Sequence, residues 1–256
     1  LGALPPIDLE GLNERAALLH RVDRKYIVPR ALVPALFDLE GEAGGLALEI
    51  AGEREAAYAS VYFDTAGREL FLAAAHGRRR RAKVRTRHYV DSGLAFLEVK
   101  TRGPRGATLK QRLPHSAEHL TALGVEGKGF VSGALGACDP SGRLTARLVP
   151  VLSSSYGRST LLLPRDGARV TVDLGLRWAL LGADGAPVQG GPRTFADQAI
   201  VETKSSSTPS LIDHWLWARG HRPAQISKFA TGLAVLEPHL PHNKWHRTLN
   251  RHYRQH

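Results

Sequence analysis

Polar and apolar residues alternate in two neighbouring segments of the chain, Arg81–Tyr89 and Leu94–Arg102. Between them lie Asp91, Ser92 and Gly93, a turn cluster that ends in glycine. Strict alternation on both sides of such a turn predicts an antiparallel β-hairpin. We expect the rest of the chain to be organised around this hairpin.

A two-residue loop, Ser92-Gly93, sets the expected register of the hairpin. Arg87 then lies across from Glu98. Arg85 lies across from Lys100, and like charges directly opposite each other destabilise a strand pair. An anion held between Arg85 and Lys100 would explain the arrangement. The simpler alternative is the solvated face of a basic surface hairpin.

The periodicity of the remaining sequence predicts both helices and strands. The helices expected from a 3.6-residue period are Leu9–Val22, Ala31–Leu39, Arg68–His76, Ser116–Leu123, Gly129–Ala137, Arg143–Leu148, Ser210–Arg219 and Ala230–Leu236. The further strands expected from a two-residue period are Arg21–Val28, Ala57–Phe63, Val151–Leu163, Arg169–Leu176 with an extension at Trp178–Leu181, and Ala199–Lys204. The Asp166-Gly167 turn joins two of these strands into a second hairpin. The chain therefore reads as an α+β protein.

Several of these strands have a polar face made of lysine, arginine and a few carboxylates. The members of these faces are Arg21, Asp23 and Lys25; Lys83, Arg85 and Arg87; Glu98, Lys100 and Arg102; Arg158 and Thr160; Arg169, Thr171 and Asp173; and Glu202 and Lys204. Every strand of a closed antiparallel β-barrel has an inward face. If the charged faces point inward, they line a channel suited to a polyphosphate chain bound with a divalent metal ion. We therefore expect a closed antiparallel β-barrel with flanking helices.

The composition narrows the class of partner. The chain of 256 residues can form one large domain or two, and its formal net charge is +11. This charge indicates a polyanionic partner: nucleic acid, polyphosphate, nucleotide or anionic membrane. No apolar stretch is long enough to span a bilayer, and the single cysteine, Cys138, fits a reducing compartment, so we expect a cytoplasmic protein. We also expect one domain over residues 1–237 and a basic, His-rich tail over residues 238–256.

Other chemistry-bearing residues have structural interpretations. Asp64 and Thr65 follow a strand and suit turn and helix-cap positions. Asp173 suits an ion pair with Arg158 or Arg169. The tail histidines have no fixed ligand spacing, which favours a solvated basic tail over a metal site; they are His242, His246, His252 and His256. No zinc-finger, helix-turn-helix, RNP or KH pattern is present, which argues against a nucleic-acid partner.

Eight short motifs occur in a fixed order from Arg21 to Gly232. They are RxDRKYIV, VYFDT, KVRTRHY, FLEVK, SYGR, ARVTVD, IVETK and SKFATG. Together they resemble the VTC domain, the polyphosphate polymerase domain of the vacuolar transporter chaperone family. That domain belongs to the triphosphate tunnel metalloenzymes, which are relatives of the CYTH domain. Each motif alone is a weak signal, whereas eight in order are specific.

The resemblance implies roles for individual residues. The residues that would grip the phosphates in the catalytic tunnel are Lys25, Arg85, Arg87, Lys100, Arg158 and Arg169. Further substrate-binding residues would be Lys83, Lys110, Lys204 and Lys228. Glu202 would hold a catalytic Mn²⁺ or Mg²⁺, and Glu98 would be either a second carboxylate ligand or an orienting partner for Arg87.

The reaction implied by the resemblance is transfer of the γ-phosphoryl group of ATP to a growing inorganic polyphosphate chain. Such transfer depends on in-line positioning and charge neutralisation more than on a protein nucleophile. The expected ligands are ATP and polyphosphate, with triphosphate or sulfate as anions that bind the same lining. Two alternatives stay open: a metal-dependent tripolyphosphatase or nucleoside triphosphatase, and a binding module for polyphosphate or nucleic acid without catalysis.

Overall fold

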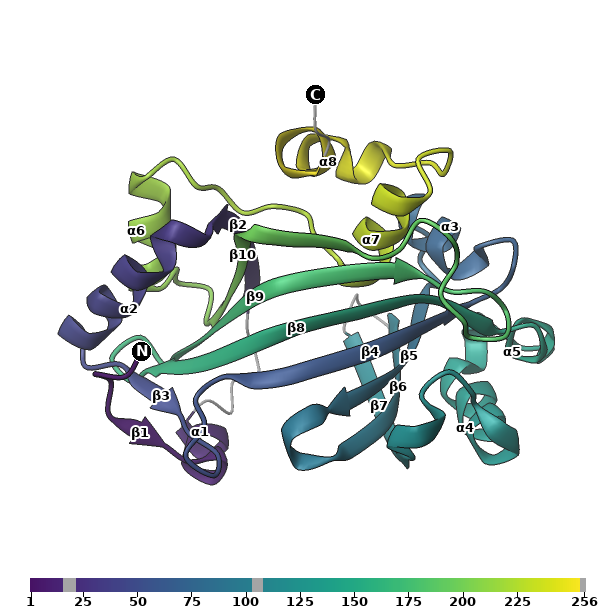
Figure 1. The fold of residues 1–256 in the computed structure, drawn as a ribbon, viewed down its shortest axis with the longest axis horizontal. Helices are drawn as coiled ribbons and strands as arrows, with labels where there is room; N and C mark the ends of the chain where they lie inside the picture. The colour runs from purple at the N-terminus through teal and green to yellow at the C-terminus, as the bar shows by residue number, and fades with distance from the viewer. Residues whose placement is uncertain (16–21, 103–107, 254–256) are drawn as a thin grey trace. The chain divides into compact units, whose positions relative to one another are not determined.

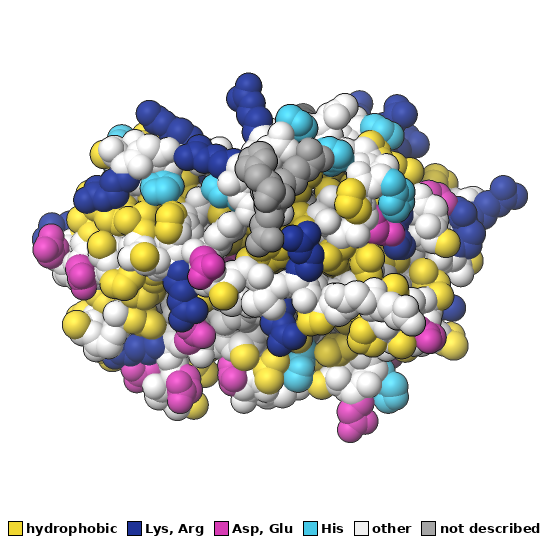
Figure 2. All heavy atoms as spheres, turned by 45° about the horizontal axis from the view of Figure 1, so that its top comes forward, with side chains coloured by type: hydrophobic (Ala, Val, Ile, Leu, Met, Phe, Trp, Pro, Cys, Tyr) yellow, Lys and Arg dark blue, Asp and Glu magenta, His cyan; other side chains and the backbone are white. Residues whose placement is uncertain are grey.

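A computed structural model describes residues 1–15, 22–102 and 108–253 (Figure 1). Arg21, His256 and residues 16–21 of the expected helix Leu9–Val22 lie outside the described residues. No helix in the described ranges is long and apolar enough to cross a membrane. Lys and Arg side chains project at many places from the face shown in Figure 2, with hydrophobic side chains exposed between them.

Strands make up much of the described chain. Their bounds are β1 (Pro6–Ile7), β2 (Val22–Pro29), β3 (Leu46–Leu48), β4 (Ala56–Asp64), β5 (Ala82–Tyr89), β6 (Leu94–Arg102), β7 (Thr108–His115), β8 (Val149–Leu163), β9 (Ala168–Leu180) and β10 (Arg193–Ser205). The helices are α1 (Leu9–Arg15), α2 (Val33–Glu42), α3 (Glu69–Ala75), α4 (Gly124–Leu135), α5 (Arg143–Ala146), α6 (Leu211–Ala218), α7 (Lys228–Leu236) and α8 (His246–His252). The α+β class predicted from the sequence is thus confirmed.

The strands form one large sheet, hydrogen-bonded in the order β2-β10-β9-β8-β4-β5-β6-β7. The registers resolved between β2 and β10 and along β4-β5-β6-β7 are antiparallel. Within the described part of the chain, β2 and β7 are the two ends of this order, so hydrogen bonds do not close the sheet. The expected antiparallel sheet is present, and the closed barrel stays a prediction.

The chain divides into two compact units. Unit 1 comprises Leu1–Ala57, Tyr156–Leu176 and Thr194–Gln225, and unit 2 comprises Tyr58–Ser155, Arg177–Arg193 and Ile226–His256. Each unit is therefore assembled from segments that are far apart in the sequence.

In unit 1, helices α2 and α6 pack their apolar faces against the sheet (Figure 1). Leu36 of α2 and Ile212 and Leu216 of α6 are fully buried in one cluster with Val28 of β2 and Val201 of β10. Ile212 and Leu216 are four residues apart, so they lie on one side of α6. This packing leaves the opposite faces of β2 and β10 available for polar residues.

In unit 2, the apolar face of the β5-β6 hairpin is covered by α4. Val84, Leu97 and Val99 are buried on this face, and the hydroxyl of Thr86 donates to the carbonyl oxygen of Leu120 at 2.7 Å. A Cβ built on Gly127 of α4 would lie 3.1 Å from Leu97 Cδ2, so the helix sits close to the sheet. The other face of the hairpin carries the charged residues.

The register of the hairpin differs from the prediction by two residues. Tyr89 pairs with Leu94, which places Arg85 opposite Glu98 and Lys83 opposite Lys100. The expected pairings of Arg85 with Lys100 and of Arg87 with Glu98 are wrong. The loop contains four residues, because Val90–Ser92 form a 3₁₀ turn and Gly93 closes it with φ 66°. A shift of two keeps every side chain on its predicted face.

Several other boundaries differ as well. Val22 begins β2 instead of ending a helix, and the expected helix Ser116–Leu123 is only a 3₁₀ turn at Ala117–His119. Ser116 Oγ accepts from the Glu118 amide and fixes that tight turn. After Pro238 the chain forms α8, and the buried Trp245 lies with its ring centroid 5.7 Å from that of Phe71. The last segment is therefore helical and packed, while its histidines His242, His246 and His252 stay half-buried or exposed.

Candidate functional site

In unit 1, a row of charges runs across strands β2 and β10. The register pairs Lys25 with Glu202 and Asp23 with Lys204. Because side chains alternate along a strand, these four residues share one face of the two-stranded ladder. They are the polar face that the sequence predicted for the IVETK and DRKY motifs.

Glu202 is the less exposed of the two carboxylates in this row, and cations surround it. Lys204 Nζ lies 2.8 Å from Glu202 Oε1, and the two side chains are only 16% and 15% exposed. Burial alone would raise the pKa of Glu202, but the charges of Lys25, Lys204 and Arg158 outweigh it and lower the pKa to about 2. The carboxylate is therefore ionised at neutral pH and sits in a positive field.

Arg158 is held in position by Asp173. Its Nε lies 2.5 Å from Asp173 Oδ1, and Nη2 lies 2.8 Å from Oδ2, which is a two-point contact between β8 and β9. The ion pair predicted for Asp173 is confirmed with Arg158. Arg169 lies four residues before Asp173 in β9, on the same face of the strand. Its guanidinium contacts the side chain of Asn13 at 3.2 Å.

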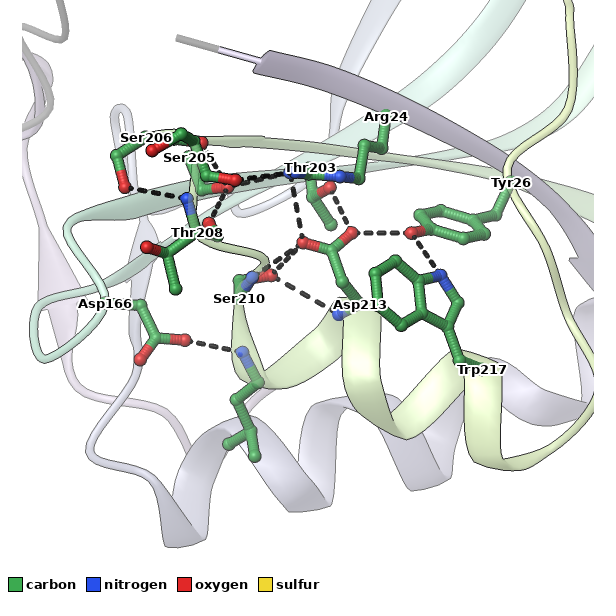
Figure 3. Close-up of polar contacts among 12 residues, drawn as sticks. Arg24, Tyr26, Asp166, Thr203, Ser205, Ser206, Thr208, Ser210, Asp213 and Trp217 are labelled. Atoms are coloured by element: carbon green, nitrogen blue, oxygen red, sulfur yellow. Dashed lines mark hydrogen bonds and ion pairs between the residues drawn. The ribbon is translucent and has the colours of Figure 1, made fainter.

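The back of the β2-β10 ladder is fastened to helix α6 through Asp213 (Figure 3). Its buried carboxylate accepts from Tyr26 at 2.6 Å, from Thr203 at 2.7 Å and from the amide of Ser210 at 2.7 Å. Tyr26 also accepts from Trp217 at 3.0 Å. Tyr26 and Thr203 each neighbour a charged residue of the front face in sequence, so this network fixes the strands that carry Lys25 and Glu202.

The sequence analysis did not predict this supporting network. A sequence signal does exist. Ser210 and Asp213 form a capping box, in which each side chain accepts from the other residue's backbone amide. The spacing Ser-x-x-Asp ahead of an apolar run is typical of this motif.

The donor set around Glu202 fits a metal ion only in part. Among the described residues, no group of three or more His, Cys, Asp and Glu side chains is placed to hold a metal ion. Asp173 is already paired with Arg158 and Asp23 is exposed, which leaves Glu202 as the largely buried carboxylate of the row. A hard divalent ion bound to phosphates takes one or two protein carboxylates and draws other ligands from the substrate. Glu202 fits that kind of site and not a metal site built by protein alone.

In unit 2, Glu98 lies at the centre of a second charged group. Its side chain is 1% exposed, and Oε2 lies 2.5 Å from Arg85 Nη2 while Oε1 faces Lys110 Nζ. Burial opposes ionisation, but Arg85, Arg87 and Lys110 together lower the pKa of Glu98 to about 2. Both oxygens of Glu98 are thus engaged with cations, and the partner it orients most directly is Arg85.

Next to this group, lysines face one another across three strands. Lys100 of β6 lies opposite Lys83 of β5 on one side and Lys110 of β7 on the other. Lys83 Nζ donates to Ser227 Oγ at 2.9 Å and lies 5.9 Å from the ring centroid of Phe229. Repulsion among like charges at this spacing disfavours the row unless an anion balances it.

The remaining predicted residues of unit 2 lie around these two groups. Arg87 has its guanidinium carbon 5.4 Å from the ring centroid of Tyr58. Lys228 is the first residue of α7, directly after Ser227, which caps that helix. Tyr62 was missed by the sequence analysis: its hydroxyl accepts from Arg85 Nη1 at 3.4 Å. Asp64 caps α3 as predicted, with its carboxylate accepting from the amides of Leu70 and Phe71.

The predicted site residues thus form two charged groups. The group in unit 1 contains Lys25, Arg158, Lys204 and Glu202. The group in unit 2 contains Lys83, Arg85, Glu98, Lys100 and Lys110. Each group combines several cations with an ionised, largely buried glutamate, an arrangement suited to an anion with many negative oxygens.

Solved structures and family models place this chain among known proteins. A candidate adenylate cyclase from Bacillus halodurans matches with a TM-score of 0.50 and 13% identity over 81% of this chain and 94% of that chain. A candidate adenylyl cyclase from Hippeastrum, described with a dominant triphosphatase activity, matches with a TM-score of 0.47 and 15% identity over 84% of this chain and 95% of that chain.

The first of these likenesses shows a shared fold. A search among curated proteins gave no match. The family model of the VTC domain matches residues 20–237, a range that contains every candidate site residue named above. The chain therefore belongs to the VTC domain family.

Proposed function

We propose that this protein is a polyphosphate polymerase, which transfers the γ-phosphoryl group of ATP to the end of an inorganic polyphosphate chain with the help of Mn²⁺ or Mg²⁺. The observation that carries the proposal is the environment of Glu202. An ionised carboxylate is held at low exposure by Lys204, Lys25 and Arg158. An ionised carboxylate among phosphate-binding cations can hold a divalent ion that also contacts the phosphates, a role that phosphate binding alone does not require.

Each residue of this group has a distinct task in the proposed reaction. Lys25 and Arg158 bind phosphate oxygens and hold the transferring group in line with the accepting oxygen. Glu202 would hold the divalent ion, which would supply charge neutralisation on the phosphates. Lys204, whose ammonium contacts Glu202 Oε1 at 2.8 Å, lies where it would also donate to a phosphate oxygen.

The group in unit 2 binds further phosphates in the proposed function. Glu98 orients Arg85 and Lys110 so that their remaining N–H groups face the ligand, and it offsets part of their charge when no ligand is bound. Lys83 and Lys100 add phosphate contacts on the same face. We assign substrate binding to Arg87, Arg169 and Lys228 on the same chemical grounds, because each carries a cation in a matched motif of the family.

The decisive test is incubation of the protein with ATP and Mn²⁺, followed by gel analysis of polyphosphate and by measurement of ADP. The proposal predicts polymer and ADP together. Glu202→Gln keeps the shape of the side chain but removes its charge, so polymer formation should fall about 100-fold or more. Binding of tripolyphosphate in the presence of a chelator should persist or tighten, because one negative charge has left the group.

Asp197→Asn is the matched control, because Asp197 is an exposed acid on the same strand, β10, at a position of opposite parity to Glu202. It should leave both polymer formation and tripolyphosphate binding unchanged. Release of phosphate from tripolyphosphate without polymer would replace the proposal by a tripolyphosphatase. Binding without turnover of any triphosphate would reduce the protein to a binding module, and a Glu202→Gln protein with parental turnover would overturn the role of Glu202.

A further inference from the structure

Arg81 and Arg102 extend the charged face of unit 2 beyond the row of lysines. Arg81 directly precedes β5, Arg102 ends β6, and the amide of Arg102 donates to the carbonyl oxygen of Arg81 at 3.2 Å. Since Lys83 lies opposite Lys100, the alternation of side chains places Arg81 and Arg102 on that same face, one step further along.

Lys244 joins these two arginines from a distant part of the chain. It lies in the 3₁₀ turn Asn243–Trp245, and its Nζ donates to the carbonyl oxygen of Ala74 at 3.0 Å. The buried ring of Trp245 secures this turn. Arg81 Nη1 donates to the carbonyl oxygen of Arg78 at 2.8 Å, so Lys244 and Arg81 bind the same short segment, at residues 74 and 78. Burial and the nearby charges of Arg81 and Arg102 lower the pKa of Lys244, which agrees with this placement.

Little negative charge balances this part of the face. On the charged face of β5, β6 and β7, the carboxylate is Glu98, which already contacts Arg85 and Lys110. Burial of the Arg81 guanidinium lowers its pKa, and the nearby charge of Arg102 lowers it further. The folded chain therefore brings together like charges that repel one another, and a polyanion would relieve this repulsion.

We propose that Arg81, Arg102 and Lys244 form a second polyphosphate-binding site, which holds a stretch of the chain away from its reacting end. The proposal rests on the proposed function for the identity of the polyanion. A strand advances about 3.3 Å per residue, so Arg81 and Lys83 offer charges about 7 Å apart along β5. A polymer with a charge on every unit can contact successive cations of this kind.

The same face indicates polyphosphate in preference to nucleic acid. Sheets that bind single-stranded nucleic acids combine cations with aromatic side chains on which bases stack. Tyr89 and Phe96 lie at the other end of the hairpin from Arg81 and Arg102, and the rings nearer to the cations, those of Tyr62, Phe229 and Trp245, are buried and offer no exposed face for stacking. The site therefore offers charge without a stacking platform.

The test compares long-chain polyphosphate with tripolyphosphate, both binding to the intact protein in a chelator and without ATP. The variant is R81Q/R102Q/K244Q. Its affinity for the long chain should fall about 10-fold or more at low salt, with a smaller salt dependence, because up to three phosphate contacts are lost. Its affinity for tripolyphosphate should stay within about twofold of the parent, since the group around Glu98 and the group around Glu202 each keep all their cations in the variant.

The control variant is R30Q/R165Q/R177Q, which removes the same charge from exposed arginines elsewhere. It should keep the parental affinity for the long chain. An equal loss in both variants would show a general effect of net charge and overturn the site. A loss of tripolyphosphate binding equal to the loss of long-chain binding would make these residues part of the first site. Binding of single-stranded RNA is measured with the same proteins, and a loss of affinity confined to RNA would make the ligand a nucleic acid.

The two proposals fail in different ways. If the parent protein makes no polymer from ATP but the variant still loses long-chain binding selectively, the proposed function fails and the second site stands. If polymer is made and the variant binds long chains like the parent, the second site fails alone.

Discussion

Arg85 and Lys100 lie on the same face of one hairpin, yet they contribute to stability with opposite signs. Arg85 is 12% exposed and contacts Glu98, which is itself almost fully buried. Lys100 is exposed and has a lysine opposite it on each side. Removing one partner of a buried pair leaves an uncompensated charge, whereas removing one of several like charges relieves repulsion.

We expect Arg85→Gln to lower the free energy of unfolding by about 3 kcal/mol, because the buried Glu98 loses the cation that contacts its Oε2. Lys100→Gln should be neutral or raise it by a few tenths of a kcal/mol. Urea unfolding at pH 7 and low salt measures both values. Equal losses in the two variants would contradict the assigned ion pair, and the gain from Lys100→Gln should disappear in high salt.

The sequence identified the charged residues of the site but not their pairing. Alternation alone placed Lys83, Arg85 and Arg87 on one face, and this does not depend on the register. The partner of Arg85 does depend on it. Four loop residues in place of two moved Glu98 from Arg87 to Arg85, because the 3₁₀ turn at Val90–Ser92 is stabilised locally and carries no clear sequence signal.

At the scale of elements, local signals predicted strands better than helix ends. The Asp166-Gly167 turn marked the β8-β9 hairpin, and both strands are present in the structure. Strand β10 begins at Arg193, six residues before the predicted start at Ala199, because backbone pairing continues where the side chains lose their alternation. The hydrogen bonds of a strand depend on its neighbour, which the sequence of that segment does not contain.

Helix α7 depends on a glycine for its packing. Gly232 is buried, and a Cβ built there would lie 2.9 Å from Leu152 Cδ2 and 3.0 Å from two ring atoms of Trp178. In α4, by contrast, a Cβ on Gly133 would meet no atom within 4 Å, and this residue is exposed. The same substitution therefore has different consequences in the two helices.

We expect Gly133→Ala to raise the free energy of unfolding by up to about 1 kcal/mol, since alanine favours the helix. Gly232→Ala gains the same propensity but overpacks the core, so the net change should be a loss of about 1–2 kcal/mol. Thermal unfolding of the two variants beside the parent protein checks the signs. A stabilised Gly232→Ala protein would mean that α7 can move away from Trp178 without cost.

At the scale of the whole molecule, the division into two units was beyond prediction from sequence. Each unit combines three separated segments of the chain, and the cores depend on contacts between them. Glu40 illustrates the same limit. The pattern of α2 does not distinguish it from the exposed Glu42, yet Glu40 is fully buried, and within the described chain its carboxyl oxygens have no hydrogen-bond partner.

The pH dependence of folding should reflect these carboxyl groups with opposite signs. The pKa values of Glu98 and Glu202 are about 2 in the folded protein, below the ordinary value of 4.5. Their stabilisation is therefore present above pH 4.5 and is lost as the pH falls toward 2. Burial raises the pKa of Glu40 to about 8, so its neutral form is favoured on folding, and its contribution is lost as the pH rises from 4.5 to 8.

Glu40→Gln separates this alkaline effect from all others. In the parent protein, Glu40 should lower the free energy of unfolding by about 3 kcal/mol between pH 4.5 and 7, at about 1.4 kcal/mol per pH unit. The Glu40→Gln variant should not show this loss. The two proteins should thus be similar near pH 4.5, and the variant should be the more stable one at pH 7 and 8. Urea unfolding across this range measures the difference, with Glu42→Gln on the exposed side of the same helix as the control. A constant difference between Glu40→Gln and the parent at every pH would contradict the protonated, buried state of Glu40, because a change in packing alone does not depend on pH.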